Sequence, residues 1–160
     1  MSDPHAPTRD ELQAFIQAKT YYYLPRWDAL DSSLRRVPPG SFNWSACFLL
    51  QLWMAYRKMY LYAVICVVSF FVLNSILLSF GVPRFYGLFL MWCFGRYGSS
   101  LYKRHVEATI RRIKTTMPAE YWTQAFKDKG GTSCWAVIPF ILWVGFTYWL
   151  YFWGMGQSVN

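Results

Sequence analysis

Hydrophobic residues are gathered in long blocks in this chain, and polar residues fill the segments between them. Residues 59–80 contain no charged side chain, and residues 132–153, which are rich in tryptophan, tyrosine and phenylalanine, contain none either. A helix needs about 20 apolar residues to cross a hydrocarbon layer roughly 30 Å thick. Both blocks reach that length, so the pattern predicts two transmembrane helices.

A third block, residues 85–102, is apolar in its first half but contains Arg96. Turn-forming residues precede it at 81–84, and a basic segment follows it from Lys103. This pattern is typical of a helix that returns the chain to the cytoplasmic side. We therefore predict a second span here, joined to the first by a very short outer turn.

The block at residues 42–56 is shorter than the others. Fifteen helical residues extend only about 22 Å, less than the hydrocarbon thickness. We predict a helix that lies in the interface or is re-entrant, and a short tilted span before a tight cytoplasmic turn is the alternative. In either case Arg57 and Lys58 belong at a membrane surface, because a basic residue at mid-bilayer costs about 2.5–3.5 kcal/mol.

The positive charges predict an orientation. Of the 16 Lys and Arg residues, seven precede Met59 and seven lie within residues 103–129. The positive-inside rule places both groups in the cytoplasm and the C-terminus in the periplasm. Because this rule accounts for the positions of the charges, we expect no nucleic-acid partner.

Composition agrees with a membrane protein. Hydrophobic residues make up 55% of the chain and charged residues only 15%, against about a quarter charged in soluble domains. The predicted fold class is an all-α integral membrane protein with about three transmembrane helices. Residues 1–40 form a cytoplasmic segment with a short helix and a Pro-rich linker, and the membrane domain, 41–160, comprises segments 42–56, 59–80, 85–102, 103–129 and 132–153.

The N-terminal segment is polar and has no apolar signal-peptide core. Thr8 followed by Glu11 matches a capping box, which predicts a short helix that ends near Tyr21. The aromatic and basic run at 21–27 is suited to the headgroup level, or to packing on a neighbouring helix; the sequence leaves both open.

After the second span, residues 103–114 predict a basic amphipathic helix in which Val106, Ile110 and Ile113 form one apolar stripe. Basic residues near a membrane surface attract anionic lipid at about 1 kcal/mol each. The predicted lipid headgroup contacts are Lys103, Arg104, Arg111, Arg112 and Lys114.

No catalytic, metal or cofactor site is predicted. His105 has Glu107 two residues away, and residues two apart on a helix point to different faces. Asn74 and Arg96 are candidates for polar contacts within the membrane, although Arg96 can instead extend to the headgroups. The cysteines lack metal or disulfide spacing and are predicted to be small buried hydrophobic residues; they are Cys47, Cys66, Cys93 and Cys134.

One motif resembles a known family. Asn43-Trp44, Trp53 and residues 56–60 (Tyr-Arg-Lys-Met-Tyr) are similar to the signature of small bacterial inner-membrane proteins known as domain of unknown function 2628. Flanking motifs extend the resemblance over about residues 22–113. The resemblance implies a bacterial inner-membrane location and no established activity. The motif residues, which we predict to anchor the chain at the membrane surface, are Asn43, Trp44, Trp53, Tyr56, Arg57, Lys58, Met59 and Tyr60.

The chain departs from that family at one position. The family commonly has Gly-Pro just before the tryptophan, where this chain has Leu50 and Gln51. Gly-Pro would break a helix, so its absence predicts a continuous short helix over 42–56.

These observations favour a non-catalytic accessory or assembly subunit whose Trp- and Tyr-rich faces pack against partner helices, pigments or lipid. An oligomeric transport or channel component is the alternative, with Asn74 and Arg96 lining a polar path. A membrane-bound enzyme that acts on lipid through His105 or Glu107 is the third hypothesis.

Overall fold

A computed structural model describes residues 6–32, 42–80, 86–139, 141–143, 145, 146 and 149. Its regular elements are all helices in these residues, which confirms the all-α class. The elements are α1 (Arg9–Ile16), α2 (Thr20–Ser32), α3 (Trp44–Tyr56), α4 (Tyr60–Ser79), α5 (Tyr86–Thr116), the short 3₁₀ helix η1 (Ala119–Tyr121) and α6 (Trp122–Lys129).

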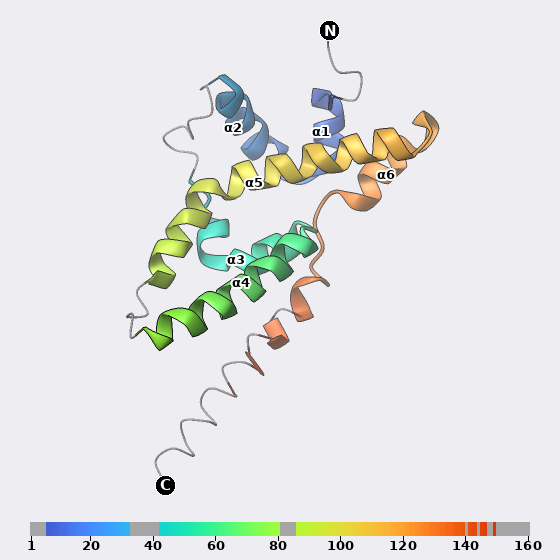
Figure 1. Ribbon diagram of the computed structural model, residues 1–160. Coiled ribbons are helices and arrows are strands. Elements are labelled where there is room, and N and C mark those ends of the chain that lie inside the picture. The colour runs from blue at the N-terminus through green and yellow to red at the C-terminus, as the bar shows by residue number, and fades with distance from the viewer. Residues whose placement is uncertain are drawn as a thin grey trace.

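Helix α5 is the centre of the molecule. Figure 1 shows α1 and α2 on one side of α5, α3 and α4 on the other, and α6 beside its C-terminal end. The predicted span at 85–102 and the predicted amphipathic helix at 103–114 are one continuous helix of 31 residues. The predicted stripe of Val106, Ile110 and Ile113 is confirmed as buried, and Tyr102 extends it by one turn.

Helix α3 packs against both α4 and α5, and two glycines of α5 allow the close approach. The N–H of Asn43 donates to the Gly95 carbonyl at 2.7 Å. A Cβ placed on Gly98 would lie 2.7 Å from the Cβ of Ala46, which is too short for two carbon atoms. Any side chain at Gly98 therefore pushes α3 away from α5.

We expect Gly98→Ala to lower the free energy of unfolding by about 1–3 kcal/mol, the usual cost of overpacking. Gly87→Ala is the matched control in the same helix, because its added methyl group would meet no atom within 4 Å. The control should be neutral or slightly stabilising. Chemical denaturation of both variants in mild detergent measures the difference, and equal effects would contradict the close approach.

Helix α3 is broken rather than continuous, so the prediction from Leu50 and Gln51 is wrong. Leu50 takes φ 36° and ψ −106°, which is not a helical conformation. A positive φ is uncommon for a residue with a side chain, and it divides α3 into two parts at Leu50.

A tight turn separates α3 from α4. The N–H of Lys58 donates to the Ala55 carbonyl at 3.0 Å, and that of Met59 donates to the Met54 carbonyl at 2.9 Å. Lys58 has φ 58°. These are the two hydrogen bonds of a Schellman motif, which ends α3 close to the predicted boundary.

The N-terminal capping box is confirmed. The Thr8 N–H donates to Glu11 Oε2 at 2.7 Å, and the Glu11 N–H donates to Thr8 Oγ1. However, α1 ends at Ile16 rather than near Tyr21, because Gln17 and Lys19 both have positive φ angles. The aromatic run that follows is part of α2.

Within α2, packing on a neighbouring helix accounts for three of the aromatic and apolar side chains. Tyr23, Leu24 and Trp27 are buried, whereas Tyr21 is 80% exposed. The ring of Tyr23 lies 5.1 Å from that of Tyr102, edge to face. The packing alternative is therefore the one that applies to Tyr23 and Trp27.

The connector after α6 ties distant helices together. The N–H of Gly131 donates to the Phe15 carbonyl at 2.7 Å, and that of Ser133 donates to the Tyr56 carbonyl at 2.9 Å. The Lys58 Nζ donates to the Asp128 carbonyl at 2.8 Å. The last apolar segment therefore begins beside the start of α4.

Within the described residues, no helix combines the length and the apolar character that a membrane crossing needs. The three spans at 59–80, 85–102 and 132–153 stay predictions. The Pro-rich linker, the outer turn at 81–84 and the last part of 132–153 lie outside the described residues.

Candidate functional site

Arg57 lies in the interior of the protein, inside a box of tyrosine rings, with only 3% of its surface exposed. Its guanidinium carbon is 4.6 Å from the ring centre of Tyr23, 5.1 Å from that of Tyr102 and 5.9 Å from that of Tyr56. Its Nη1 donates to the Ala18 carbonyl at 3.4 Å. Because no carboxylate of the described residues pairs with it, the aromatic faces are its main electrostatic partners.

The position of Arg57 corrects the prediction of a membrane anchor. Arg57 joins the α1–α2 turn, α2, α3 and α5, and it is not on the surface. A sequence of two adjacent basic residues is usually exposed, but here the turn after α3 directs the two side chains to different environments. Lys58 is half-buried and Arg57 is buried.

Three further motif residues are also buried and are not anchors. Asn43 accepts a hydrogen bond from the Ala46 N–H at 3.0 Å and so caps α3. Trp53 packs edge to face on Tyr102 at 6.0 Å, and Met59 is fully buried. Trp44 and Tyr60 are exposed, Tyr56 is half-buried, and these three residues retain the predicted anchoring role as a hypothesis.

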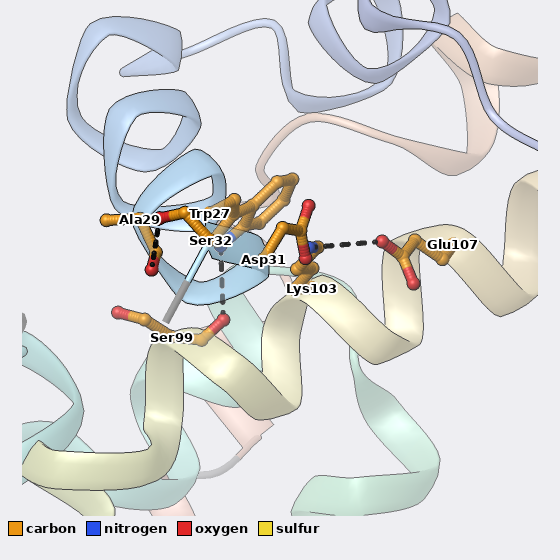
Figure 2. A network of polar contacts seen from close by, with 7 residues as sticks. All are labelled: Trp27, Ala29, Asp31, Ser32, Ser99, Lys103 and Glu107. Carbon is orange, nitrogen blue, oxygen red and sulfur yellow. Dashed lines mark hydrogen bonds and ion pairs between the residues drawn. The ribbon is translucent and has the colours of Figure 1, made fainter. Parts of the chain in front are cut away.

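Lys103 belongs to a polar network between α2 and α5 (Figure 2). Its ammonium group pairs with Asp31 and, at 3.6 Å, with Glu107. The Trp27 indole N–H donates to the Ser99 carbonyl at 3.2 Å in the same interface. Only 12% of the Lys103 side chain is exposed, so the predicted headgroup contact at Lys103 is wrong.

Lys114 has a similar role between α1 and α5. Its Nζ lies 2.8 Å from Glu11 Oε2, donates to the Ala6 carbonyl at 3.0 Å and lies 5.4 Å from the ring centre of Trp122. Its side chain is 4% exposed. The prediction of lipid contact at Lys114 is therefore also wrong, because α1 packs against α5 on the side where Lys114 lies.

The Glu11–Lys114 pair gives the protein an acid-sensitive contact. Partial burial alone would raise the pKa of Glu11, but the hydrogen bonds from Lys114 and Thr8 hold that pKa below its ordinary value. A lowered folded-state pKa means that the stabilisation is complete above the unfolded-state pKa of about 4.3. It is lost as the pH falls through the folded-state value.

Glu11→Gln should therefore reduce the free energy of unfolding at pH 7 by on the order of 1 kcal/mol. It should also flatten the loss of stability below about pH 4. Asp10→Asn removes a neighbouring exposed carboxylate of α1 and is the control. Denaturation curves between neutral and acid pH test this; an unchanged acid dependence in Glu11→Gln would contradict the assignment.

The remaining candidates do not form a joint site. His105 is half-buried, its ring lies edge-on to Tyr62 at 5.5 Å, and burial lowers its pKa. Glu107 faces Lys103 instead. Arg96 is half-buried in α5, and the side chain of Asn74 lies outside the described part.

In the described part of the chain, no three His, Cys, Asp or Glu side chains lie close enough together to hold a metal ion. Cys47 is buried as predicted, and Cys66 and Cys93 are half-buried. Cys134 is exposed, so the prediction of a buried residue is wrong there.

The surface of the molecule is divided in two. We call α1, α2, residues 103–116 of α5, η1 and α6 the polar half, and α4, residues 86–94 and the described part of 135–149 the apolar half. In the described polar half only Tyr21 and Tyr121 are exposed large hydrophobic residues. Among the described side chains of α4 alone, nine large hydrophobic residues are exposed: Tyr60, Leu61, Val64, Ile65, Val68, Phe70, Val72, Leu73 and Ile76.

Comparison with protein-family models, curated proteins and solved structures finds no match. The resemblance to the family of unknown function stays a prediction.

Proposed function

We propose that this protein is a non-catalytic membrane protein whose apolar half inserts into a bacterial inner membrane and whose polar half lies at the cytoplasmic surface. Residues 59–80, 85–102 and 132–153 would be its membrane segments. In this role it is an accessory or assembly subunit that packs against a larger membrane complex. The observation that carries the proposal is the exposed apolar surface of α4.

The exposure of α4 is not confined to one side. Leu61 is 70% exposed, Val68 is 55% and Phe70 is 40%. Val68 and Phe70 are two residues apart and therefore point to different faces of the helix. Exposure of apolar residues on several faces differs from the single buried stripe of a helix on a water-soluble protein.

The cost of this surface in water supports insertion. Full burial of a large apolar side chain stabilises a protein by about 1.5–3 kcal/mol. Each half-exposed residue would therefore gain about 1 kcal/mol of transfer free energy if its remaining surface were removed from water. Seven exposed aliphatic side chains and the exposed Phe70 lie in the described part of α4. A hydrocarbon layer or the apolar face of a partner would supply this stabilisation.

The accessory role is supported by how the charged residues are used. Arg57 is enclosed by tyrosines, and Lys103 and Lys114 are paired with carboxylates. These contacts hold helices together in the polar half. A polar half whose helices are joined by these contacts, next to an apolar surface, is suited to docking on another membrane protein.

Two experiments on the full chain test the proposal. After cell lysis the protein should stay in the membrane pellet through alkaline carbonate extraction, whereas release into the supernatant would refute insertion. In mild detergent it should elute with a larger complex whose other subunits can be identified by mass spectrometry. Elution only as a free monomer would refute the accessory role but not insertion.

A further inference from the structure

Four of the six cationic side chains of α5 lie on two different faces of the helix. Lys103 and Lys114 face α2 and α1, where carboxylates neutralise them. Arg104 and Arg112 lie on the outer face and are exposed. The helix thus separates charges used for folding from charges presented to the surroundings.

The outer face carries positive charge without an internal counter-charge. Arg104 and Arg112 are eight residues apart, which is about 12 Å along a helix. Ala108 is exposed between them, so no large side chain separates the two guanidinium groups. Among the described residues no carboxylate forms an ion pair with either arginine, while Glu11, Asp28, Asp31 and Glu107 are paired elsewhere.

This face borders the apolar half. His105 follows Arg104 directly, and its ring contacts Tyr62 in the first turn of α4 at 5.5 Å. Tyr60 is exposed in the same turn of α4. The turn of α5 that carries Arg104 and His105 therefore lies next to the first turn of α4.

We infer that the outer face of α5, through Arg104 and Arg112, binds the phosphates of anionic phospholipids at the membrane surface. This inference rests on the proposed function, because it requires the apolar half to be inserted next to the headgroups. Guanidinium groups bind phosphate oxygens in a bidentate manner, which suits them to this partner. Lys103 and Lys114 take no part.

Flotation with lipid vesicles tests the inference on the purified full chain. Binding is measured on vesicles of phosphatidylcholine alone and on vesicles that also contain phosphatidylglycerol. We expect preference for the anionic vesicles, and we expect Arg104→Gln/Arg112→Gln to reduce that preference about fivefold for each arginine, the equivalent of about 1 kcal/mol. Added salt should weaken the preference of the unmodified protein.

The matched control is Lys19→Gln/Lys129→Gln, which removes two exposed positive charges, one just after α1 and one at the end of α6. It should keep the preference within about twofold, since its charges lie away from the α5 face and are screened. Equal loss in both double variants, or equal binding of the unmodified protein to both vesicle types, would overturn the inference and leave insertion standing. Failure to bind either vesicle would refute insertion itself. Binding to double-stranded DNA as tight as to anionic vesicles would also overturn the lipid assignment.

Discussion

Replacing Arg57 by alanine should lower the free energy of unfolding by about 2–5 kcal/mol, the range for truncating a large buried side chain. The substitution removes the contacts with Tyr23 and Tyr102 and leaves a cavity where α2, α3 and α5 meet. Denaturation of the purified protein in mild detergent measures the change.

Lys58→Ala is the matched control because it removes the same charge from the next residue. The Lys58 side chain donates one hydrogen bond, to the Asp128 carbonyl, and that bond is exposed. We expect a loss of no more than about 1 kcal/mol. If both variants lost equal stability, the adjacent residues would act alike, as a pair of surface anchors would, and the interior role of Arg57 would be refuted.

Val68→Arg should reduce membrane retention about 100-fold. A central arginine costs about 2.5–3.5 kcal/mol on insertion scales, and Val68 lies in the middle of α4. If α4 instead faced water, the same substitution at a half-exposed position would be neutral or would improve solubility. The measurement is the fraction of protein that remains in carbonate-washed membranes.

Gln13→Arg places the same new charge on the exposed surface of α1 and should leave retention unchanged. Thermal unfolding of both variants in detergent shows whether the polar half stays folded. Retention of Val68→Arg equal to that of the control would contradict insertion of α4.

Much of the helical layout could be predicted from local patterns. The capping box at Thr8 and Glu11 marked the start of α1, and the long uncharged block marked α4 to within one residue at each end. The 3.6-residue spacing of Val106, Ile110 and Ile113 identified the buried face of α5. These features depend on neighbours within one or two helical turns.

The surroundings of the charged residues could not be predicted in the same way. Arg57 is enclosed by Tyr23 and Tyr102, which are distant in the sequence, and Lys114 meets Glu11 only when α1 folds onto α5. Hydropathy treats every such cation as a surface residue. The sequence pattern therefore predicts a membrane-surface position for Arg57, Lys103 and Lys114, although all three side chains lie between helices.

The close contact of α3 with α5 had a sequence signal that was missed. Gly95 and Gly98 are followed by Ser99 and Ser100, a run of small residues on one helix. Small residues at this spacing allow two helices to approach closely. The break at Leu50 had no such signal, because leucine is a good helix former.

The contacts that close the polar half imply an order of synthesis and assembly. Gln17 binds the Lys127 carbonyl across 110 residues, and Lys114 binds the Ala6 carbonyl across 108. Since the N-terminus leaves the ribosome first, α1 and α2 must wait for α5 and α6 before they can pack. α4 emerges within that interval, so under the proposed function its insertion would precede completion of the polar half, at a stage when Phe15 and Trp27 are not yet covered.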